Sequence, residues 1–199
     1  MAKLKIEYLG HSCFRLEYGG KRIVLDPYED GSVPGYKPLR TEAEFVYCSH
    51  DHHDHNAAKI VKKKDGGKPN FAVETLETDH DDAGGTLRGR NTVHMFRFGA
   101  LRVAHLGDLG RELTAAEQKR LRGVDVLMIP IGGYYTIDAR TAKKVVDSLD
   151  PGAVIPMHYR TETADYEVLG GLDEFFLQFT EERPDILPLT YGGYIMIET

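Results

Sequence analysis

The first third of the chain alternates apolar and polar residues with the period of two that is typical of β-strands. This alternation predicts strands over Lys3–Leu9, Ser12–Tyr18 and Arg22–Leu25. Because Gly19-Gly20 provides a tight turn between the second and third of these, we expect an antiparallel meander. Residues 28–43 are rich in glycine, proline and polar groups and predict a surface loop, after which Glu44–Cys48 reads as a short strand.

The remainder of the chain mixes apolar runs that predict strands with amphipathic stretches that predict helices. A helix is expected over Asn56–Lys64, with a lysine-rich end before Gly66-Gly67. Two further helices have clear starts, a capping box at Thr114 that opens a helix to about Arg122 and a cap at Asp138 that opens one to Leu149. The predicted strands are Phe71–Thr78, Asn91–Phe98, Leu101–Leu106, Val124–Ile131 and Ala153–Pro156; a helix over Leu172–Phe179 and two short strands ending at Ile197 follow.

This order of elements predicts one domain over residues 1–199, built from two mixed β-sheets with helices outside them. No internal repeat, linker or low-complexity segment divides the chain. With 41% apolar residues, the chain is long enough to bury a sizeable core.

The composition of the chain argues against some classes of binding partner. A formal net charge of −6 argues against nucleic-acid binding through a basic face, and no apolar stretch is long enough to span a membrane. Two cysteines, Cys13 and Cys48, are too few for a disulfide framework, so we expect a cytoplasmic protein. The sequence leaves open whether the chain forms a homo-oligomer. The nine histidines are the compositional anomaly that needs an explanation.

Six potential metal ligands occupy the six positions from His50 to His55, which read His-Asp-His-His-Asp-His. Imidazole nitrogens and carboxylate oxygens are ligands for zinc, iron or manganese. One tetrahedral ion cannot use six ligands, so the spacing indicates two metals, or one metal with supporting residues around it. The competing interpretation is a solvated polar loop that binds metal loosely.

Three other candidate ligands each follow a predicted strand. They are His80, Asp108 and His158. Any one of them alone would more often be a turn residue than a ligand. Because strand ends at one edge of a sheet converge, we expect all three to approach the histidine cluster.

The cluster resembles the His-x-His-x-Asp-His motif of the metallo-β-lactamase superfamily, and His80, Asp108 and His158 resemble its remaining ligands in the right order. Further similarity lies in Leu9–Phe14, Leu25–Pro27, His105–Asp108, Pro130–Gly133 and Ile155–Tyr159, which resemble zinc-dependent hydrolases related to L-ascorbate-6-phosphate lactonase. The resemblance covers nearly the whole chain. It implies the superfamily's four-layer αβ/βα sandwich, an α+β fold.

The resemblance also implies a ligand set for two divalent ions, expected to be Zn²⁺ with Mn²⁺ or Fe²⁺ as alternatives. One metal would be held by His50, His52 and His80, the other by Asp54, His55 and His158, with Asp108 bridging them. Asp108 and Asp54 are accordingly the expected catalytic carboxylates. His53 stands at the motif's variable position and is not an expected ligand.

Residues around the ligands have expected supporting roles. Asp26 resembles a recurrent carboxylate that orients the histidine loop, and Asp51 is close enough to support a ligand. His11 either reaches the site from the first hairpin or is buried with a hydrogen bond to the backbone. Candidate substrate contacts follow the strand ends as polar or basic side chains: Tyr135, Thr136, Arg88, Arg90 and Arg160.

Two adjacent dications would lower the pKa of a bridging water to give hydroxide, polarise a carbonyl or phosphoryl oxygen and stabilise the leaving oxygen. Asp108 could accept the proton as the hydroxide attacks. With two ligand carboxylates and a hydroxide, the site keeps about one positive charge, which favours a small anionic ester, lactone or phosphodiester.

Three alternatives remain at this stage. An iron-dependent redox enzyme, similar to the sulfur dioxygenases of the same fold, would use the same ligands. A metal-binding module without turnover would also retain them. A helical His-Asp phosphohydrolase is disfavoured by the alternating strands and glycine hairpins.

Overall fold

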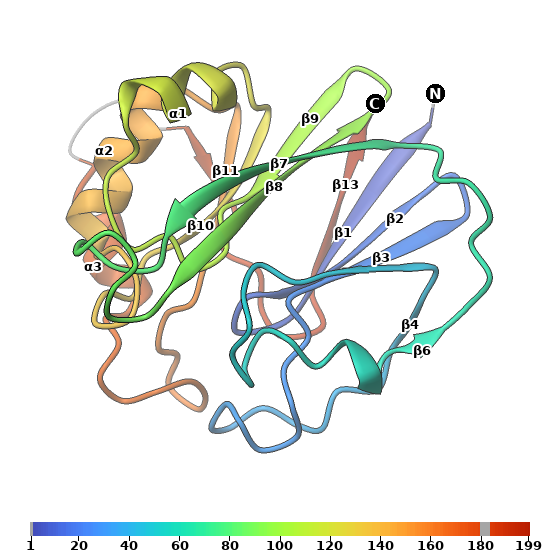
Figure 1. Cartoon of the computed structure of the whole chain (residues 1–199), viewed down its shortest axis with the longest axis horizontal. Helices are drawn as coiled ribbons and strands as arrows, with labels where there is room; N and C mark the ends of the chain where they lie inside the picture. The colour runs from blue at the N-terminus through green and yellow to red at the C-terminus, as the bar shows by residue number, and fades with distance from the viewer. Residues whose placement is uncertain (1, 180–183) are drawn as a thin grey trace.

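Two β-sheets face one another in the computed structural model, which describes residues 2–179 and 184–199 (Figure 1). In the described residues the first sheet has five strands in the order β13-β1-β2-β3-β5. The second has six, in the order β12-β11-β10-β9-β8-β7. Both sheets are mixed: β3 pairs in parallel with β5, and β9 pairs in parallel with β10 but antiparallel to β8. The predicted fold class is confirmed.

The strands of the first sheet are β1 (Lys3–Gly10), β2 (Cys13–Tyr18), β3 (Lys21–Leu25), β5 (Phe45–Tyr47) and β13 (Tyr194–Glu198). Those of the second are β7 (Ala72–Asp79), β8 (Arg90–Phe98), β9 (Leu101–His105), β10 (Val126–Pro130), β11 (Ala153–Met157) and β12 (Asp185–Ile186). A small parallel pair consists of β4 (Glu42–Ala43) and β6 (Lys62–Lys63). The helices are α1 (Ala115–Leu121), α2 (Ala139–Leu149) and α3 (Leu172–Phe176).

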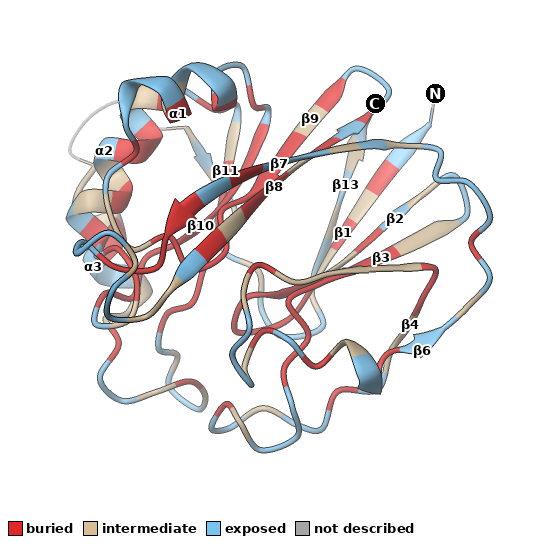
Figure 2. Ribbon diagram, viewed as in Figure 1, coloured by how far each residue is buried: buried red, intermediate tan, exposed pale blue. Residues whose placement is uncertain are grey.

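The inner faces of the two sheets enclose one hydrophobic core. Ile6 and Leu16 of the first sheet belong to the same buried cluster as Val103 and Met128 of the second. Figure 2 shows the buried positions along these strands as red segments. Since each strand alternates its side chains between two faces, the opposite faces need separate cover.

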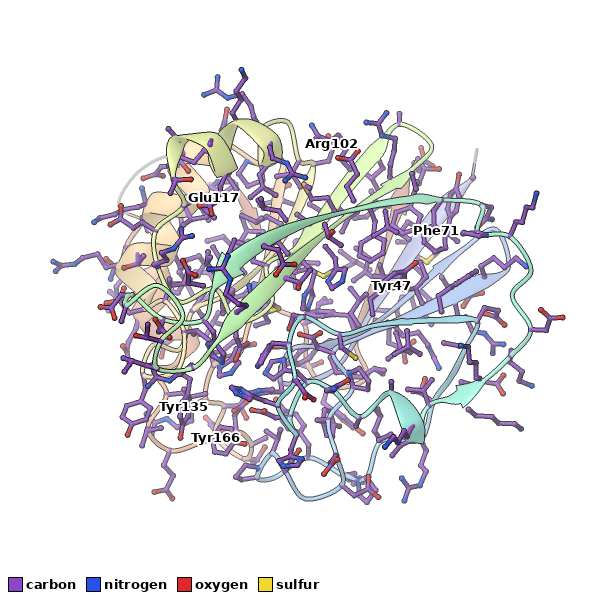
Figure 3. The ribbon with its side chains drawn as sticks, viewed as in Figure 1. Tyr47, Phe71, Arg102, Glu117, Tyr135 and Tyr166 are labelled. Carbon is purple, nitrogen blue, oxygen red and sulfur yellow. The ribbon has the colours of Figure 1, made fainter. Side chains whose placement is uncertain are left out.

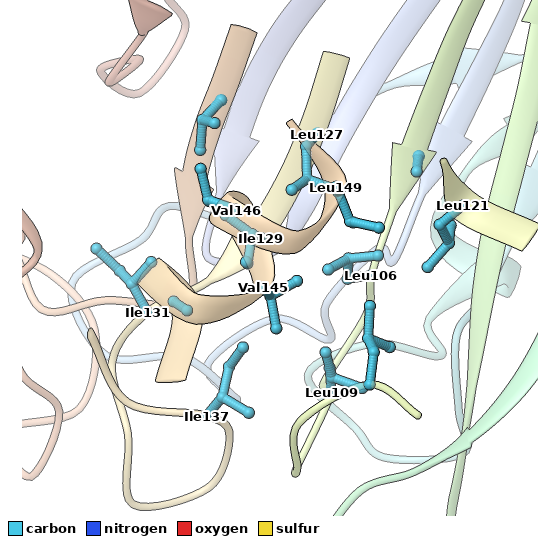
Figure 4. Packing of buried hydrophobic residues seen from close by; sticks show 14 of the residues in the cluster. Leu106, Leu109, Leu121, Leu127, Ile129, Ile131, Ile137, Val145, Val146 and Leu149 are labelled. Atoms are coloured by element: carbon cyan, nitrogen blue, oxygen red, sulfur yellow. The ribbon is translucent and has the colours of Figure 1, made fainter. Parts of the chain in front are cut away.

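Helices cover the outer face of the second sheet. Figure 4 shows the apolar side of α2 packed over β10, with Val145, Val146 and Leu149 above Leu127 and Ile129. None of the helices in the described residues is long and apolar enough to cross a membrane. The outer face of the first sheet is covered by loop segments, in which Tyr28, Val33, Leu39 and Val61 are buried.

The predicted helix over Asn56–Lys64 is wrong. The segment forms a single 3-10 turn, Ala58–Ile60, and then extends into β6. Pairing with residues 41–43 replaces the helical hydrogen bonds in this segment. The N–H of Lys62 donates to the Thr41 carbonyl and that of Lys64 to the Ala43 carbonyl. The predicted last helix is also shorter than expected, because α3 ends at Phe176.

The strand directions place the candidate ligands at one edge of each sheet. β7 and β9 run in the same direction, because each is antiparallel to β8, and β11 runs with them through β10. Their carboxyl ends lead directly into His80, the Asp108 turn and His158. In the facing sheet, β5 leads into the cluster that begins at His50. The fold therefore brings residues that are distant in sequence to one place.

The cap of α2 gives a direct test of the helix layer. The Asp138 carboxylate accepts the N–H of Thr141 at 2.8 Å. Asp138→Ala should lower the free energy of unfolding by about 1 kcal/mol, because it removes this cap. Asp138→Asn keeps a hydrogen-bond acceptor and should retain most of that stability. Urea unfolding of the wild-type protein and the two variants measures both changes. Equal losses of stability in the two variants would contradict the capping role.

Candidate metal centre

Two groups of potential ligands lie beside one another at the strand ends. His50, His52 and His80 form one group, whose donor atoms all lie within 4.8 Å of one another. Asp54, His55 and His158 belong to the other, and this group also includes His11. Each group therefore offers at least three ligand atoms at a separation suited to one metal ion.

Asp108 lies between the two groups. Its Oδ2 is 3.4 Å from Nε2 of His80 on one side, and 3.2 Å from Nε2 of both His55 and His158 on the other. His50 Nε2 is 3.8 Å away. The side chain is buried and the surrounding imidazoles hold its pKa well below the usual range, although burial alone would raise it. The carboxylate is therefore ionised and close to ligands of both groups.

Several polar atoms that point into this space have no hydrogen-bond partner in the described residues. They include Nε2 of His11, His50, His55 and His158, and Oδ1 of Asp108. Each buried unsatisfied polar atom costs about 1–3 kcal/mol, so such a concentration needs an explanation. Bound cations would satisfy these lone pairs, and the donor set of imidazole and carboxylate fits divalent zinc, manganese or iron.

A hydrogen-bond network holds the histidine loop from behind. Oδ2 of Asp26 is 2.9 Å from Nδ1 of His55 and accepts the Ser49 hydroxyl at 2.6 Å, while Ser49 Oγ is 2.9 Å from Nδ1 of His50. Although burial opposes ionisation, the imidazoles of His105 and His55 hold the pKa of Asp26 below its usual range. The carboxylate thus directs the Nε2 atoms of His55 and His50 toward the centre, as was expected of Asp26.

Burial also prepares His50 for metal binding. It lowers the pKa of the His50 imidazole to about 3, despite the favourable charge of Asp108. Burial likewise lowers the pKa of His80. Since a metal ligand must be a neutral imidazole, these two rings are in the required form at neutral pH.

The structure identifies supporting residues that the sequence analysis missed. The Asn91 side chain accepts the N–H of Asp108 at 2.9 Å and donates to the Leu106 carbonyl at 2.9 Å. Asp165 Oδ2 lies 2.8 Å from Nδ1 of His11. Asn91 is one polar residue in a predicted strand, and Asp165 is 154 positions from His11, so no local pattern indicates either role.

His11 lies in the turn between β1 and β2, beside the second ligand group. It is fully buried and its ring approaches the site instead of bonding to the backbone. Although burial opposes protonation, the carboxylates of Asp165 and Asp54 raise its pKa to about 9. These carboxylates therefore place negative charge beside the ring, which favours either a proton on it or a cation next to it.

A cleft of about 610 Å³ opens onto the centre. It is lined by Ser32, Asp51, His52, His53, Asp54, His80, Arg88, Asp108, Tyr135 and Tyr166. The Tyr135 and Tyr166 rings are 5.6 Å apart and lie together in Figure 3, and the Arg88 guanidinium is 5.7 Å from the Tyr135 ring. Arg88, Tyr135 and Tyr166 form a polar and aromatic wall beside the ligands.

Three candidate substrate residues are placed away from this cleft. Thr136 is buried and donates its hydroxyl to the Ile137 carbonyl. Arg90 pairs with Asp79, and Arg160 lines a different groove.

The two variable positions of the motif face the cleft without contacting the centre. The Asp51 carboxylate accepts a hydrogen bond from Asn56, and His53 is 86% exposed with Nδ1 3.2 Å from Glu29. Neither residue is in a ligand group of the described chain.

Comparison with known proteins agrees with the fold and the ligand groups. Residues 5–158 match the sequence profile described as the Beta-lactamase superfamily domain. A UPF0173 metal-dependent hydrolase from Caldivirga maquilingensis is 30% identical, over 78% of this chain and 82% of its own. Another from Thermoplasma acidophilum is 28% identical over 99% and 96%.

Solved structures give the same result. A Thermotoga maritima protein assigned to the Zn-dependent hydrolases of the metallo-β-lactamase superfamily is 32% identical, with a TM-score of 0.73 over 93% of this chain and 97% of its own. The metallo hydrolase Igni18 from Ignicoccus hospitalis, at 22% identity, has the same fold with a TM-score of 0.73 over 99% of each chain.

The chain belongs to the metallo-β-lactamase superfamily and, within it, to the UPF0173 family of metal-dependent hydrolases. It is a metal-dependent hydrolase with a His and Asp cluster suited to metal binding. The narrower similarity to ascorbate-6-phosphate lactonase stays a prediction.

Gly107 gives a test of how tightly the Asp108 turn is built. Gly107 has a φ of +55°, and a Cβ there would lie 2.3 Å from Asn91 Oδ1 and 2.5 Å from Ser49 Cβ. Gly84 has a φ of +70° but nothing within 4 Å of a Cβ. Gly84→Ala should lower the free energy of unfolding by about 1–2 kcal/mol, because alanine is strained in the left-handed backbone conformation. Gly107→Ala should lower it by about 1–3 kcal/mol more, because the added Cβ also overlaps its neighbours. Urea unfolding measures both; equal costs would show that the turn accommodates the extra carbon.

Proposed function

We propose that this hydrolase uses two divalent ions, with zinc as the expected metal, to cleave a small anionic ester, lactone or phosphodiester. The observation that carries the proposal is the place of Asp108, whose Oδ2 is within 3.4 Å of imidazoles from both ligand groups. A carboxylate in that position can bridge two ions.

A pair of dications would supply an activated water and a Lewis acid for the reacting oxygen. The protein's own contribution is to fix the donors that hold them. Asp26 orients His55, Asn91 holds the backbone of Asp108, and burial keeps His50 neutral. Asp54 and Asp108 both line the cleft, so a substrate bound there would meet both carboxylates.

The cleft supports an anionic substrate. Arg88 lines it and has no carboxylate partner among the described ion pairs, whereas Arg90 pairs with Asp79. The side chains of Tyr135 and Tyr166 line the same wall. A volume of about 610 Å³ suits a small molecule better than a polymer.

The cysteines support the proposed cytoplasmic location. Both Cys13 and Cys48 are free thiols. Burial raises the pKa of Cys48 to about 12, which keeps it in the unreactive thiol form.

Asp108→Ala tests the bridging role. Removing the shared carboxylate should lower bound zinc from two ions per chain toward one or fewer and should abolish hydrolysis of phosphodiester and lactone probes. Elemental analysis and turnover assays measure the two effects, and Asp82→Ala, which removes an exposed carboxylate in the neighbouring loop, is the control. Full zinc content with retained activity in Asp108→Ala would refute the bridge. Iron in protein prepared without added metal would favour the redox alternative.

Arg88→Ala tests the charge of the substrate. Loss of a charge-assisted contact worth about 1.5–3 kcal/mol should lower kcat/KM for an anionic aryl phosphodiester about tenfold or more. Hydrolysis of a neutral aryl ester should change little. Arg90→Ala is the matched control, since this arginine lies outside the cleft and pairs with Asp79. Equal losses on the charged and neutral probes would contradict an anion-binding role for Arg88.

A further inference from the structure

We propose that His11 is an additional ligand of the metal held by Asp54, His55 and His158, and that Asp165 positions it. The inference rests on the proposed two-metal centre. It assigns a fourth protein side chain to one ion and makes the two metal positions chemically different.

The geometry of His11 is that of a ligand. Its ring is fully buried in the turn between β1 and β2, 4.1 Å from the His158 ring and 5.0 Å from the His55 ring, measured between centroids. Its Nε2 has no hydrogen-bond partner in the described residues. That atom belongs to the same compact donor group as Asp54, His55 and His158.

Asp165 fixes which nitrogen faces the centre. Its carboxylate is 2.8 Å from Nδ1 of His11, so Nδ1–H donates to it and Nε2 keeps its lone pair when the ring is neutral. This is the carboxylate–histidine–metal arrangement that orients ligands in metal sites. The alternative partner for Nε2 is Asp54 Oδ2 at 3.4 Å, which is long for a hydrogen bond.

Hydrogen bonds to the segment 32–34 hold the loop that carries Asp165 in position. Asp165 has a φ of +77°, and its N–H donates to the Pro34 carbonyl at 2.9 Å. Next to it, the Tyr166 hydroxyl donates to the Ser32 carbonyl at 2.6 Å. The Asp165 side chain is fully buried, and a buried carboxylate is costly unless it is paired. Its ion-pair partner in the described residues is His11, while its other oxygen accepts the N–H of Tyr166 at 3.0 Å.

The backbone links His11 to the other ligands. His11 has a φ of +56° and its carbonyl accepts the N–H of His158 at 3.1 Å; His158 itself has a φ of +52°. Residues other than glycine rarely adopt this conformation and do so mainly where the surrounding structure requires it. The hydrogen bond between the backbones of His11 and His158 therefore keeps both rings in the same ligand group.

The extra ligand makes the centre asymmetric. His11, His55 and His158 are buried and do not line the cleft, whereas His52 and His80 do. The inner ion, held by four side chains and Asp108, would have five protein ligands and no room for substrate. The outer ion, held by three histidines and Asp108, would have one protein ligand fewer, so it is the ion that could take a further ligand from the cleft by expanding to five-coordinate. The substrate would then meet the outer ion, and chelators would remove that ion first.

The test isolates the inner site. His52→Ala disables the outer group, so zinc affinity measured by competition with a chelator then reports the inner site alone. In that background, His11→Gly should weaken zinc binding more than about 100-fold, and Asp165→Asn about 10- to 100-fold. Glycine is chosen because it tolerates the φ of +56°. His94→Gln, which changes a buried histidine outside the ligand groups, is the control and should leave zinc affinity unchanged.

Two further readouts separate ligation from a structural role. Added imidazole should restore inner-site affinity to the His11→Gly protein, because it can occupy the vacated position. The visible spectrum of the Co²⁺ form should change in the same variant. Unchanged zinc affinity in His11→Gly, while the wild-type protein binds two zinc ions, would overturn the His11 inference alone. Binding of only one zinc ion by the wild-type protein would instead overturn the two-metal proposal.

Discussion

The structure depends on one unfavourable arrangement, the burial of several imidazole nitrogens and a carboxylate oxygen that have no hydrogen-bond partner within the described residues. Asp108 is at the middle of this arrangement, in contact range of His55, His80 and His158. Cores rarely accept such a group, because each unpaired polar atom lowers stability. Bound cations would coordinate these atoms and remove the destabilising effect of leaving them unpaired. Metal binding should therefore stabilise the folded protein.

Much of the surrounding structure serves to hold these atoms in place. Asp26 and Ser49 support the histidine loop, Asn91 and Gly107 support Asp108, and loop 161–170 brings Asp165 to the first hairpin. These supports come from both sheets and from distant parts of the chain. The two sheets therefore act as a rigid frame that brings the ligands together, while the loops complete the site.

The centre has two sides with different access. The three histidines of the inner ligand group, His11, His55 and His158, are buried. His52 and His80 of the outer group line the cleft together with Arg88 and Tyr135. In the proposed two-metal centre, this difference would allow one ion to be held firmly while the other contacts the substrate.

The fold was largely predictable, because it depends on local pattern, whereas the expected ligand groups came from the resemblance to the metallo-β-lactamase motif. Alternation predicted the meander and apolar runs predicted the later strands, and His80, Asp108 and His158 were recognisable as polar residues directly after predicted strands. The segment Asn56–Lys64 was misassigned because its apolar spacing suits a helix, while pairing with Glu42–Ala43 decides its backbone.

The supporting residues were harder to predict. Asp165 and Asn91 were not predictable, because each acts through a contact made only in the folded chain. His11 was noticed, but its direction depends on Asp165.

The central claim is that Asp108 bridges two metal ions. X-ray absorption spectroscopy of the zinc-reconstituted protein tests it most directly, because it reports the distance between neighbouring metals. The account predicts two zinc ions per chain, with a zinc–zinc separation of about 3.5–4 Å. A single zinc ion per chain, or two ions without a zinc–zinc contribution in the spectrum, would contradict it.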